Sequence, residues 1–219
     1  MTGPEKRCDP MKLQVPFVQL PVTFDAAALA EEVASIDDRH WRARAIGVTG
    51  NSALTLVTTD GDPDNDDLAG AMRPTPYLRQ CPRIMQVMDA LGATWGRSRL
   101  MKLYGQAEGS AHVDTNYYWR ERMRVHVPIV TSPDVRFQCG EGEVNMRPGE
   151  VWIFDTWRRH RVVNGATTER IHLVLDTVGG AKLWDLIAAG RAPGAAAAAS
   201  RSRSRSTARG PRRRWISRR

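Results

Sequence analysis

Three side chains that can bind a metal ion stand in two separate parts of the sequence. His112 and Asp114 are separated by one residue, and His160 follows much later in the chain. Side chains at positions i and i+2 of a strand point to the same face, so His112 and Asp114 can present an imidazole beside a carboxylate. Two imidazoles and one carboxylate on one face of an octahedron bind ferrous iron and leave three positions open. An H-x-D pair alone occurs by chance on many surfaces, so the interpretation depends on the residues around it.

An arginine ten positions after His160 indicates what the open positions could hold. Asn164-Gly165 lies midway between His160 and Arg170 and is typical of a hairpin tip. This turn predicts that His160 and Arg170 are cross-strand neighbours on one face. A guanidinium beside the metal has the fork geometry to bind the far carboxylate of 2-oxoglutarate. The sequence therefore predicts a site for iron, a chelating 2-oxo acid and dioxygen.

Alternate residues from 122 to 126 are polar, and the residues between them are apolar. As a strand, this segment has one face with Arg122, Arg124 and His126 and one face that belongs to a core. A solvated polar side is the simplest interpretation and is preferred for Arg122. For Arg124 and His126 a functional role is favoured, because a barrel that holds a charged co-substrate requires a polar interior.

Short strands dominate the second half of the chain. From residue 99 onward the hydrophobic pattern has a period of two, interrupted by Gly, Pro or Asn turns. The predicted strands are residues 99–104, 123–130, 135–139, 144–146, 150–154, 161–163 and 170–176. So many short strands in succession predict a mainly β fold, a sandwich or barrel.

The first half supplies helices that we expect to pack outside these strands. Residues 25–36 have helical spacing with Asp25 as a predicted N-cap, and residues 80–91 form a second amphipathic pattern that ends at Gly92. Residues 13–22, bounded by prolines, predict an edge strand, and residues 53–58 another strand. Residues 181–189 predict a last short helix.

The net charge of +8 is concentrated in the C-terminal tail. Ten arginines, and no lysine or acidic residue, occur from position 191 onward, so residues 1–190 carry about −2. The tail is rich in Arg, Ser and Ala and is expected to be disordered. Such a tail can bind nucleic acid, but it also occurs without a dedicated partner, and the latter is preferred. We predict one domain, with residues 1–95 as an N-terminal support region, 96–190 as the β core and 191–219 as the tail.

Several classes of protein are disfavoured by the composition. Cys8, Cys81 and Cys139 lack the pairing expected of disulfide frameworks or zinc sites. The chain has neither an apolar run of about 20 residues nor a secretory signal, so we expect a cytoplasmic protein that does not associate with membranes. The acidic residues 60–67 lack the spacing of a calcium loop and are interrupted by Pro63, which predicts a solvated loop.

The segment from His112 to Asp176 resembles the aspartyl/asparaginyl β-hydroxylase family of Fe(II)/2-oxoglutarate-dependent dioxygenases. The matching features are His112-x-Asp114, Arg124-x-His126-x-Pro128, Met146-x-Pro148-Gly149-Glu150, Phe154-Asp155, His160, Asn164 and Arg170-Ile-His172-Leu-Val-Leu-Asp176. The match is close over about 65 residues, and the preceding part of the chain agrees only in outline.

The resemblance implies a double-stranded β-helix, also called a jelly roll or cupin-like fold, with Fe(II), 2-oxoglutarate and O2. By the same resemblance, the site residues are the iron ligands His112, Asp114 and His160, the co-substrate residues Arg170 and His126, and Arg124 for a substrate carboxylate. Some relatives lack the carboxylate at the position of Asp114. Its presence completes the triad and argues against halogenase chemistry, which needs that position vacant for chloride.

Asn116, Trp119 and Trp157 lie in segments outside the family pattern. We expect them to shape the substrate pocket at its mouth, although aromatic core packing is an equal alternative. The predicted function is hydroxylation of an unactivated C–H bond in a carboxylate-bearing small molecule, such as an amino acid. Two alternatives stay open: a hydroxylase of Asp or Asn side chains in a peptide or protein, and a non-catalytic cupin-like binding protein whose tail binds nucleic acid.

Overall fold

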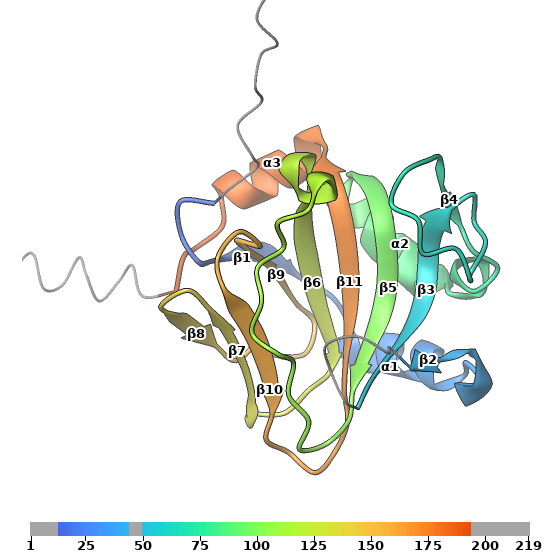
Figure 1. Cartoon of the computed structure of the whole chain (residues 1–219), viewed down its shortest axis with the longest axis horizontal. Helices are drawn as coiled ribbons and strands as arrows, with labels where there is room; N and C mark the ends of the chain where they lie inside the picture. The colour runs from blue at the N-terminus through green and yellow to red at the C-terminus, as the bar shows by residue number, and fades with distance from the viewer. Residues whose placement is uncertain (1–12, 44–49, 194–219) are drawn as a thin grey trace, which may run out of the picture.

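The computed structural model describes residues 13–43 and 50–193, which contain two antiparallel sheets (Figure 1). The larger sheet has eight strands: β1 (Phe17–Thr23), β2 (Arg42–Ala43), β3 (Asn51–Thr59), β4 (Met72–Pro74), β5 (Thr94–Leu103), β6 (Met123–Val130), β9 (Glu150–Phe154) and β11 (Arg170–Gly179). The smaller sheet has three: β7 (Val135–Cys139), β8 (Gly142–Val144) and β10 (His160–Asn164).

Strands distant in sequence are neighbours in both sheets. The larger sheet has the order β1-β9-β6-β11-β5-β3-β2, with β4 paired to β3, and the smaller has the order β10-β7-β8. The segment after β5 pairs with β10 through two isolated bridges, Glu108 with Val163 and His112 with His160. In Figure 1 this green segment runs beside β10, in front of the larger sheet. His112 is therefore attached to the smaller sheet although it is not part of a regular strand.

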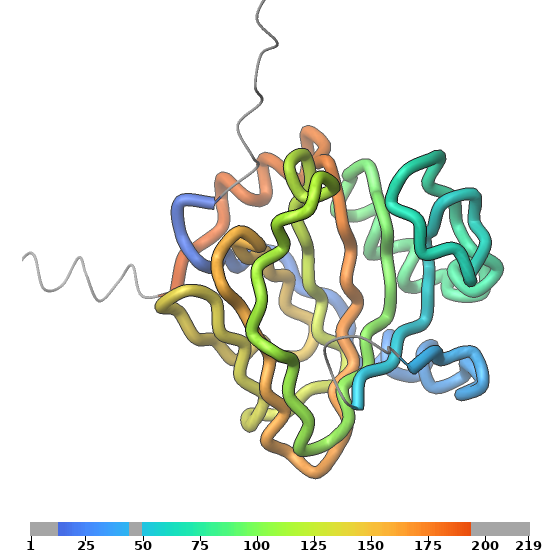
Figure 2. The backbone as a smooth tube through the Cα atoms, in the orientation of Figure 1, coloured from blue at the N-terminus to red at the C-terminus, as the bar shows by residue number. Residues whose placement is uncertain are grey.

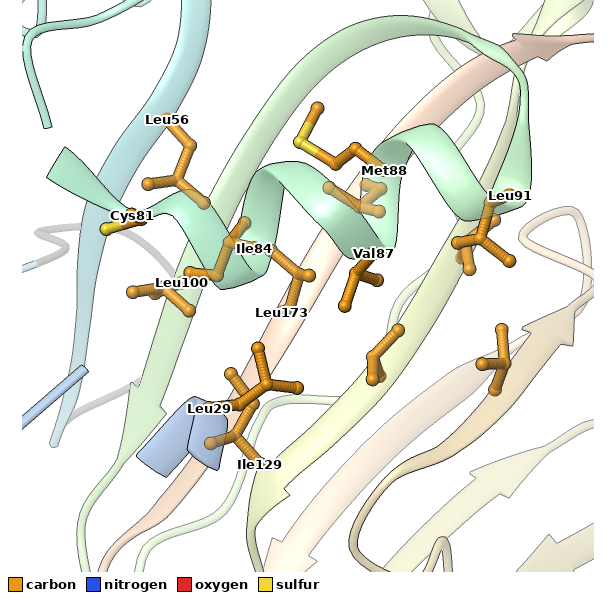
Figure 3. Packing of buried hydrophobic residues seen from close by; sticks show 14 of the residues in the cluster. Leu29, Leu56, Cys81, Ile84, Val87, Met88, Leu91, Leu100, Ile129 and Leu173 are labelled. Atoms are coloured by element: carbon orange, nitrogen blue, oxygen red, sulfur yellow. The ribbon is translucent and has the colours of Figure 1, made fainter. Parts of the chain in front are cut away.

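Helices cover the outer face of the larger sheet, as predicted. The helices α1 (Ala26–Ala34) and α2 (Pro82–Leu91) share one hydrophobic core with residues of β3, β5, β6 and β11. Figure 3 shows Ile84 and Val87 of α2 pointing toward the sheet, near Leu100 of β5 and Leu173 of β11. This apolar face supplies most of the burial that stabilises the fold, because hydrophobic stabilisation scales with the apolar area removed from water.

The predicted helix boundaries are confirmed to within a few residues. The Asp25 carboxylate accepts a hydrogen bond from the N–H of Ala28 at 3.0 Å and caps α1. Gly92 ends α2 in the left-handed conformation, with φ of 60°. The last helix, α3 (Ala181–Ala188), also forms, and it contacts β1. None of the described helices has the length and apolar composition needed to span a membrane.

The inner face of the larger sheet is polar. Along β11, Arg170, His172 and Asp176 alternate with Leu173 and Leu175 of the outer core, and all five side chains are buried. A second cluster fills part of the space between the two sheets; its buried members are Phe17, Phe137, Cys139, Val144, Met146, Trp152 and Phe154. The strands thus use one face for the core and the other for charged groups in an enclosed position.

The predicted hairpin between His160 and Arg170 is wrong. β10 pairs with β7, whereas β11 pairs with β5 and β6, so the chain crosses from one sheet to the other between them (Figure 2). Asn164 holds the crossing segment, because its side-chain amide donates to the carbonyl oxygens of Leu103, Tyr104 and Thr168 at 2.8–3.2 Å. These bonds tie the turn to the end of β5 instead of closing a two-residue hairpin.

Two other boundaries differ from the predicted ones. The strand expected at 144–146 is β8, which ends at Val144, because the Asn145 amide donates to the carbonyl oxygens of Ser132 and Val135 at 2.8 Å. Arg191, expected in the tail, pairs with Gln19 of β1. The predicted disorder of the rest of the tail, from residue 194, lies outside the described residues. The acidic segment 60–67 forms turns, and Arg42 contacts Asp64 and Asp66 there.

Candidate metal and co-substrate site

His112, Asp114 and His160 come together as predicted. Each offers one ligand atom, and these atoms all lie within 4.8 Å of one another. The Nε2 atoms of His112 and His160 are 3.6 and 4.0 Å from the Asp114 carboxylate oxygens. The backbone of the two segments holds this arrangement, because the N–H of Asp114 donates to the carbonyl oxygen of Thr156 at 3.0 Å.

Both histidines present Nε2 to the site. The Nδ1 atom of His112 lies 2.9 Å from the carbonyl oxygen of Ser110, and that of His160 lies 2.9 Å from the carbonyl oxygen of Arg158. A carbonyl oxygen can only accept, so each Nδ1 must carry the proton and each Nε2 keeps its lone pair. Burial also lowers the pKa of His160 to about 4, which keeps this imidazole neutral. Imidazoles oriented in this way, with Nε2 toward the site, fit a divalent metal ion.

Arg170 is buried on the inner face of β11, and no carboxylate of the described residues forms an ion pair with it. Among the described residues its Nε has no hydrogen-bond partner, and burial lowers the pKa of Arg170 to about 9. The guanidinium lines the same cavity as the three metal-binding residues. A buried, unpaired guanidinium is costly unless a ligand anion meets it. This residue therefore fits the carboxylate of a bound dicarboxylic acid.

His126 and His172 form a buried pair next to Arg170. Their Nδ1 atoms are 3.4 Å apart, so one imidazole donates to the other, and neither Nε2 has a partner among the described residues. Burial first, and the nearby Arg170 charge second, lower the pKa of both histidines well below the usual value. His126 lines the cavity, which agrees with its predicted role at the co-substrate. His172, two residues after Arg170 on the same strand, thus contacts His126.

Arg124 makes closer contacts inside the protein than the sequence suggested. Its Nε lies 2.8 Å from Asp176 Oδ1, and another of its nitrogens lies 3.3 Å from Asp114 Oδ2. The ring of Trp119 packs against the guanidinium at 4.3 Å. Arg124 thus lines the cavity, as predicted, but two carboxylates already hold it.

The cavity around these residues has a volume of about 550 Å³. Of the three residues predicted to shape its mouth, Asn116 and Trp119 line it. Trp157 is not among the lining residues and lies in the turn after β9, where its N–H donates to Asp155 Oδ1 at 3.1 Å. Trp119 is also almost fully buried, in a 3-10 helix (Tyr117–Glu121), so it combines the pocket role with the packing alternative.

Sequence reasoning missed three arginines that line the cavity: Arg97, Arg99 and Arg161. Arg97 and Arg99 are at alternate positions of β5. Their side chains point to the opposite face of the sheet from the core residue Leu100. The alternation Arg97-x-Arg99-x-Met101 was a usable signal, because residues at i and i+2 share a face. It was overlooked because the predicted strand began only at residue 99.

The fold and the site together define a non-haem iron oxygenase that uses 2-oxoglutarate. The family itself follows from the sequence: residues 26–179 match the Aspartyl/Asparaginyl beta-hydroxylase family, and the chain belongs to it. This match confirms the resemblance seen in the motifs. The comparison with curated proteins gives no match.

Solved structures share the fold. A 2OG-Fe(II) oxygenase family oxidoreductase from Burkholderia pseudomallei is 16% identical, with a TM-score of 0.52 over 78% of this chain and 89% of the other. A prolyl hydroxylase from Trichoplax adhaerens, in complex with a hypoxia inducible factor oxygen degradation domain peptide fragment, is 10% identical, with a TM-score of 0.51 over 75% of this chain and 84% of the other. The predicted double-stranded β-helix is confirmed.

The enzyme uses Fe(II), 2-oxoglutarate and O2. His112, Asp114 and His160 fit the metal, because two neutral imidazoles and one carboxylate form the donor set of ferrous oxygenases. Arg170 and His126 fit the co-substrate, since both are buried, line the cavity and have a polar atom without a partner in the described part of the chain. When bound, iron and 2-oxoglutarate supply the activation of dioxygen that oxidises a C–H bond, and the protein supplies orientation and exclusion of water.

Proposed function

We propose that this enzyme hydroxylates an unactivated C–H bond of a carboxylate-bearing small molecule, an amino acid or a derivative of one. The observation that carries this proposal is the charge of the cavity. Among the described residues, five arginines line it, Arg97, Arg99, Arg124, Arg161 and Arg170, together with one acidic residue, Asp114. A site of this composition selects anions, because clefts lined by one sign of charge attract ligands of the other.

Iron and co-substrate together do not neutralise the positive charge of the arginines that line the cavity. Fe(II) brings two positive charges and 2-oxoglutarate brings two negative charges, so their binding leaves the balance unchanged. Asp176 contacts Arg97 and Arg124, and Glu108 contacts Arg161. Among the described residues, Asp114, Asp176 and Glu108 contact three of the five arginines, namely Arg97, Arg124 and Arg161. A substrate carboxylate would add an anion to this arginine-rich cavity.

The size of the cavity agrees with a small substrate. Its volume of about 550 Å³ is within the range of small-molecule sites, about 300–1,000 Å³. In this proposal Arg170 and His126 bind 2-oxoglutarate, while Asn116 and Trp119 border the substrate. Arg124 contributes positive charge to the substrate space. Trp157 contributes only if its side chain moves toward the cavity.

A peptide substrate is the second candidate, and one observation favours it. The side chain of His112 is 52% exposed, so one flank of the metal site faces solvent. An extended peptide could place an Asp or Asn side chain there from outside. The Trichoplax prolyl hydroxylase, which shares the fold, has a peptide fragment bound.

A first experiment tests the co-substrate site. Anaerobic protein is loaded with Fe(II), and 2-oxoglutarate binding is measured by calorimetry for the wild type, Arg170→Ala and Arg136→Ala. Arg136 is a suitable control because it is exposed and contacts Glu143. We expect binding to be lost in Arg170→Ala and retained in Arg136→Ala. Equal binding in all three proteins would refute the assignment.

A second experiment tests the substrate class. Stimulated succinate formation is measured with a panel of free amino acids, their N-acyl and amide derivatives, and short peptides containing Asp or Asn. We expect free carboxylates to stimulate turnover and the matching amides to fail. Stimulation by blocked peptides alone would favour the peptide hydroxylase.

A further inference from the structure

Asp176 lies at the centre of a buried charged cluster on the inner face of the larger sheet. Its side chain is fully buried, and Arg124 is directly opposite on the neighbouring strand β6. Arg124 Nε lies 2.8 Å from Asp176 Oδ1, and Arg124 also lies 3.5 Å from Asp176 Oδ2. Arg97 Nε approaches the same Oδ2 at 3.8 Å. Asp176 therefore holds the edge of the Arg124 guanidinium with two contacts, a geometry that fixes its plane.

Trp119 packs against the face of the Arg124 guanidinium, whereas Asp176 contacts its edge. The Trp119 ring lies 4.3 Å from Arg124 Cζ and is itself packed edge-on against Tyr118 at 5.1 Å. A guanidinium stacked on an indole is attracted by the ring and cannot rotate away without losing that contact. Asp176 contacts Nε and Nη2 of Arg124, and Trp119 covers one face of the guanidinium. The third nitrogen, Nη1, is left to contact another group.

That remaining nitrogen is directed at Asp114. Arg124 Nη1 donates to Asp114 Oδ2 at 3.3 Å, His112 Nε2 lies 3.6 Å from Oδ1, and His160 Nε2 lies 4.0 Å from Oδ2. Each oxygen thus lies near one histidine, but the hydrogen bond from the buried guanidinium goes to Oδ2. A carboxylate can bind a metal through one oxygen or through both. An oxygen already bonded to a guanidinium is a poorer metal ligand.

From this geometry we infer that Arg124, anchored by Asp176, is a positioning residue that occupies Asp114 Oδ2 and leaves Oδ1 as the metal-binding oxygen. A carboxylate restricted to one oxygen takes one coordination position, and three positions then remain for the co-substrate and dioxygen. The inference revises the predicted role of Arg124 as the partner of a substrate carboxylate. It rests on the metal site and is independent of which substrate is hydroxylated.

The test uses Co(II) as a spectroscopic probe of the full-length protein, in the absence of 2-oxoglutarate and substrate. The visible d–d bands of bound Co(II) report coordination number, and titration gives the Co(II) affinity. Arg124→Lys keeps the charge but removes the fork that contacts Asp176 and Asp114 together. Asp176→Asn keeps the shape of the anchor but removes its charge. We expect both variants to change the Co(II) spectrum and to lower the Co(II) affinity by about 10-fold or more, the usual cost of removing a residue that orients a metal ligand.

Two control variants make the same kinds of substitution at another ion pair, that of Arg161 with Glu108. Arg161→Lys matches Arg124→Lys, because Arg161 lines the cavity but contacts Gln138 and Glu108 instead of Asp114. Glu108→Gln matches Asp176→Asn in the charge removed. Neither control should alter the Co(II) spectrum. Equal changes in the controls would show that the effect does not depend on the contacts of Arg124 with Asp176 and Asp114, and would overturn the inference.

The result also separates this inference from the alternative role of Arg124. If Arg124 served only the substrate or the co-substrate, Arg124→Lys would bind Co(II) with the wild-type spectrum and affinity, which would overturn the inference. If Asp176→Asn does not fold, as judged by circular dichroism, Arg124→Lys decides the question alone. Loss of 2-oxoglutarate binding in Arg170→Ala is a separate measurement, so failure of the co-substrate assignment would not be mistaken for failure of this one.

Discussion

The backbones of His112 and His160 are joined by a pair of hydrogen bonds. The N–H of His112 donates to the carbonyl oxygen of His160 at 3.0 Å, and the N–H of His160 donates to His112 at 2.9 Å. The two imidazoles lie above this bridge with ring centroids 4.4 Å apart. The segment carrying His112 is therefore held in place before any metal binds, and a metal adds a further link between this segment and β10.

The first prediction is that a divalent metal ion stabilises the fold through this link. A ligand that binds only the native state adds about 2.7 kcal/mol at 100 times its Kd. We expect Mn(II) to raise the thermal midpoint of the wild type and to have no effect on His160→Gln. His40→Gln is the control, because His40 contacts Tyr77 away from the site. An equal shift in all three proteins would mean that Mn(II) binds elsewhere.

The second prediction concerns how much the buried guanidinium of Arg170 destabilises the ligand-free protein. Burial lowers the pKa of Arg170 to about 9, so the charged form is disfavoured in the ligand-free protein. We expect Arg170→Met to raise the free energy of unfolding of the ligand-free protein by about 1–3 kcal/mol, since an uncompensated buried polar group is removed. The same variant should no longer be stabilised by 2-oxoglutarate. Denaturant unfolding with and without 2-oxoglutarate measures both effects.

The control for Arg170→Met is Arg136→Met, a change at an exposed arginine of β7. Surface substitutions usually change stability by no more than about 0.5 kcal/mol. A large loss of stability in Arg170→Met would show that Arg170 has a structural partner, and the prediction would then be abandoned.

The alternation of side chains predicted the strands but not how they pair. The pattern around Arg124 and His126 placed these residues on one face correctly, because the side-chain period of a strand is fixed at two. Which strand lies beside another is a long-range property that local pattern does not contain. Asn164-Gly165 has the composition of a tight hairpin, yet the Asn164 amide binds backbone carbonyls of β5 and sends the chain to the other sheet.

The residues of the candidate site could be predicted where their spacing or a family motif identified them. His112 and Asp114 share a short segment, and the motif match supplied His160 and Arg170. The partners of Arg124 were not predictable, because Asp176 is opposite Arg124 only in the register between β6 and β11. The same holds for the pair of His126 and His172. Register sets these contacts, and it is fixed by the packing of both sheet faces.

The third prediction is a loss of stability at mildly acidic pH. Burial lowers the pKa of His126 and His172 well below the usual histidine value of about 6.5, so only the unfolded chain takes up protons as the pH falls below that value. The stability contributed by the neutral histidines is therefore complete above that pH and decreases below it. The expected slope is about 1.4 kcal/mol per pH unit for each histidine.

Urea unfolding of the metal-free protein between pH 7.5 and pH 5 measures this slope. His172→Asn should reduce the slope, because one of the buried histidines is removed, whatever its effect on stability at pH 7.5. If the slope were the same in the variant and the wild type, His172 would not be the source of the acid sensitivity.

The fourth prediction concerns Gly149, part of the Met-x-Pro-Gly-Glu motif. Gly149 has a φ of 78°, and a Cβ there would lie 2.1 Å from the carbonyl oxygen of Phe24. Its N–H donates to Pro128 at 2.8 Å, so the turn joins β6 to the N-terminal segment. We expect Gly149→Ala to lower the free energy of unfolding by about 1–3 kcal/mol or more. Gly109→Ala is the matched control, since its nearest neighbour would be Val162 Cγ1 at 3.4 Å, and it should unfold nearly as the wild type does.

The fifth prediction separates the enzyme from its basic tail. Residues 194–219 contain nine of the arginines, so truncation after residue 193 changes the net charge from +8 to about −1. Arg191 must be kept, because its N–H and its guanidinium both donate to Gln19, at 2.9 and 2.8 Å. We expect the 1–193 chain to bind Mn(II) and 2-oxoglutarate as the full-length chain does. A 1–190 chain should be less stable by about 1 kcal/mol, because these bonds to β1 are lost.

The same truncation tests the binding-protein alternative. Binding of single-stranded RNA by a basic tail falls steeply with salt, since it depends on counterion release. Any RNA affinity of the full-length chain at low salt should therefore disappear in the 1–193 chain, while its co-substrate binding stays. If the truncated chain instead lost 2-oxoglutarate binding, the tail would have to take part in the site. That result would contradict the assignment of the site to residues 97–176, because the arginines and metal ligands of the cavity are all within that range.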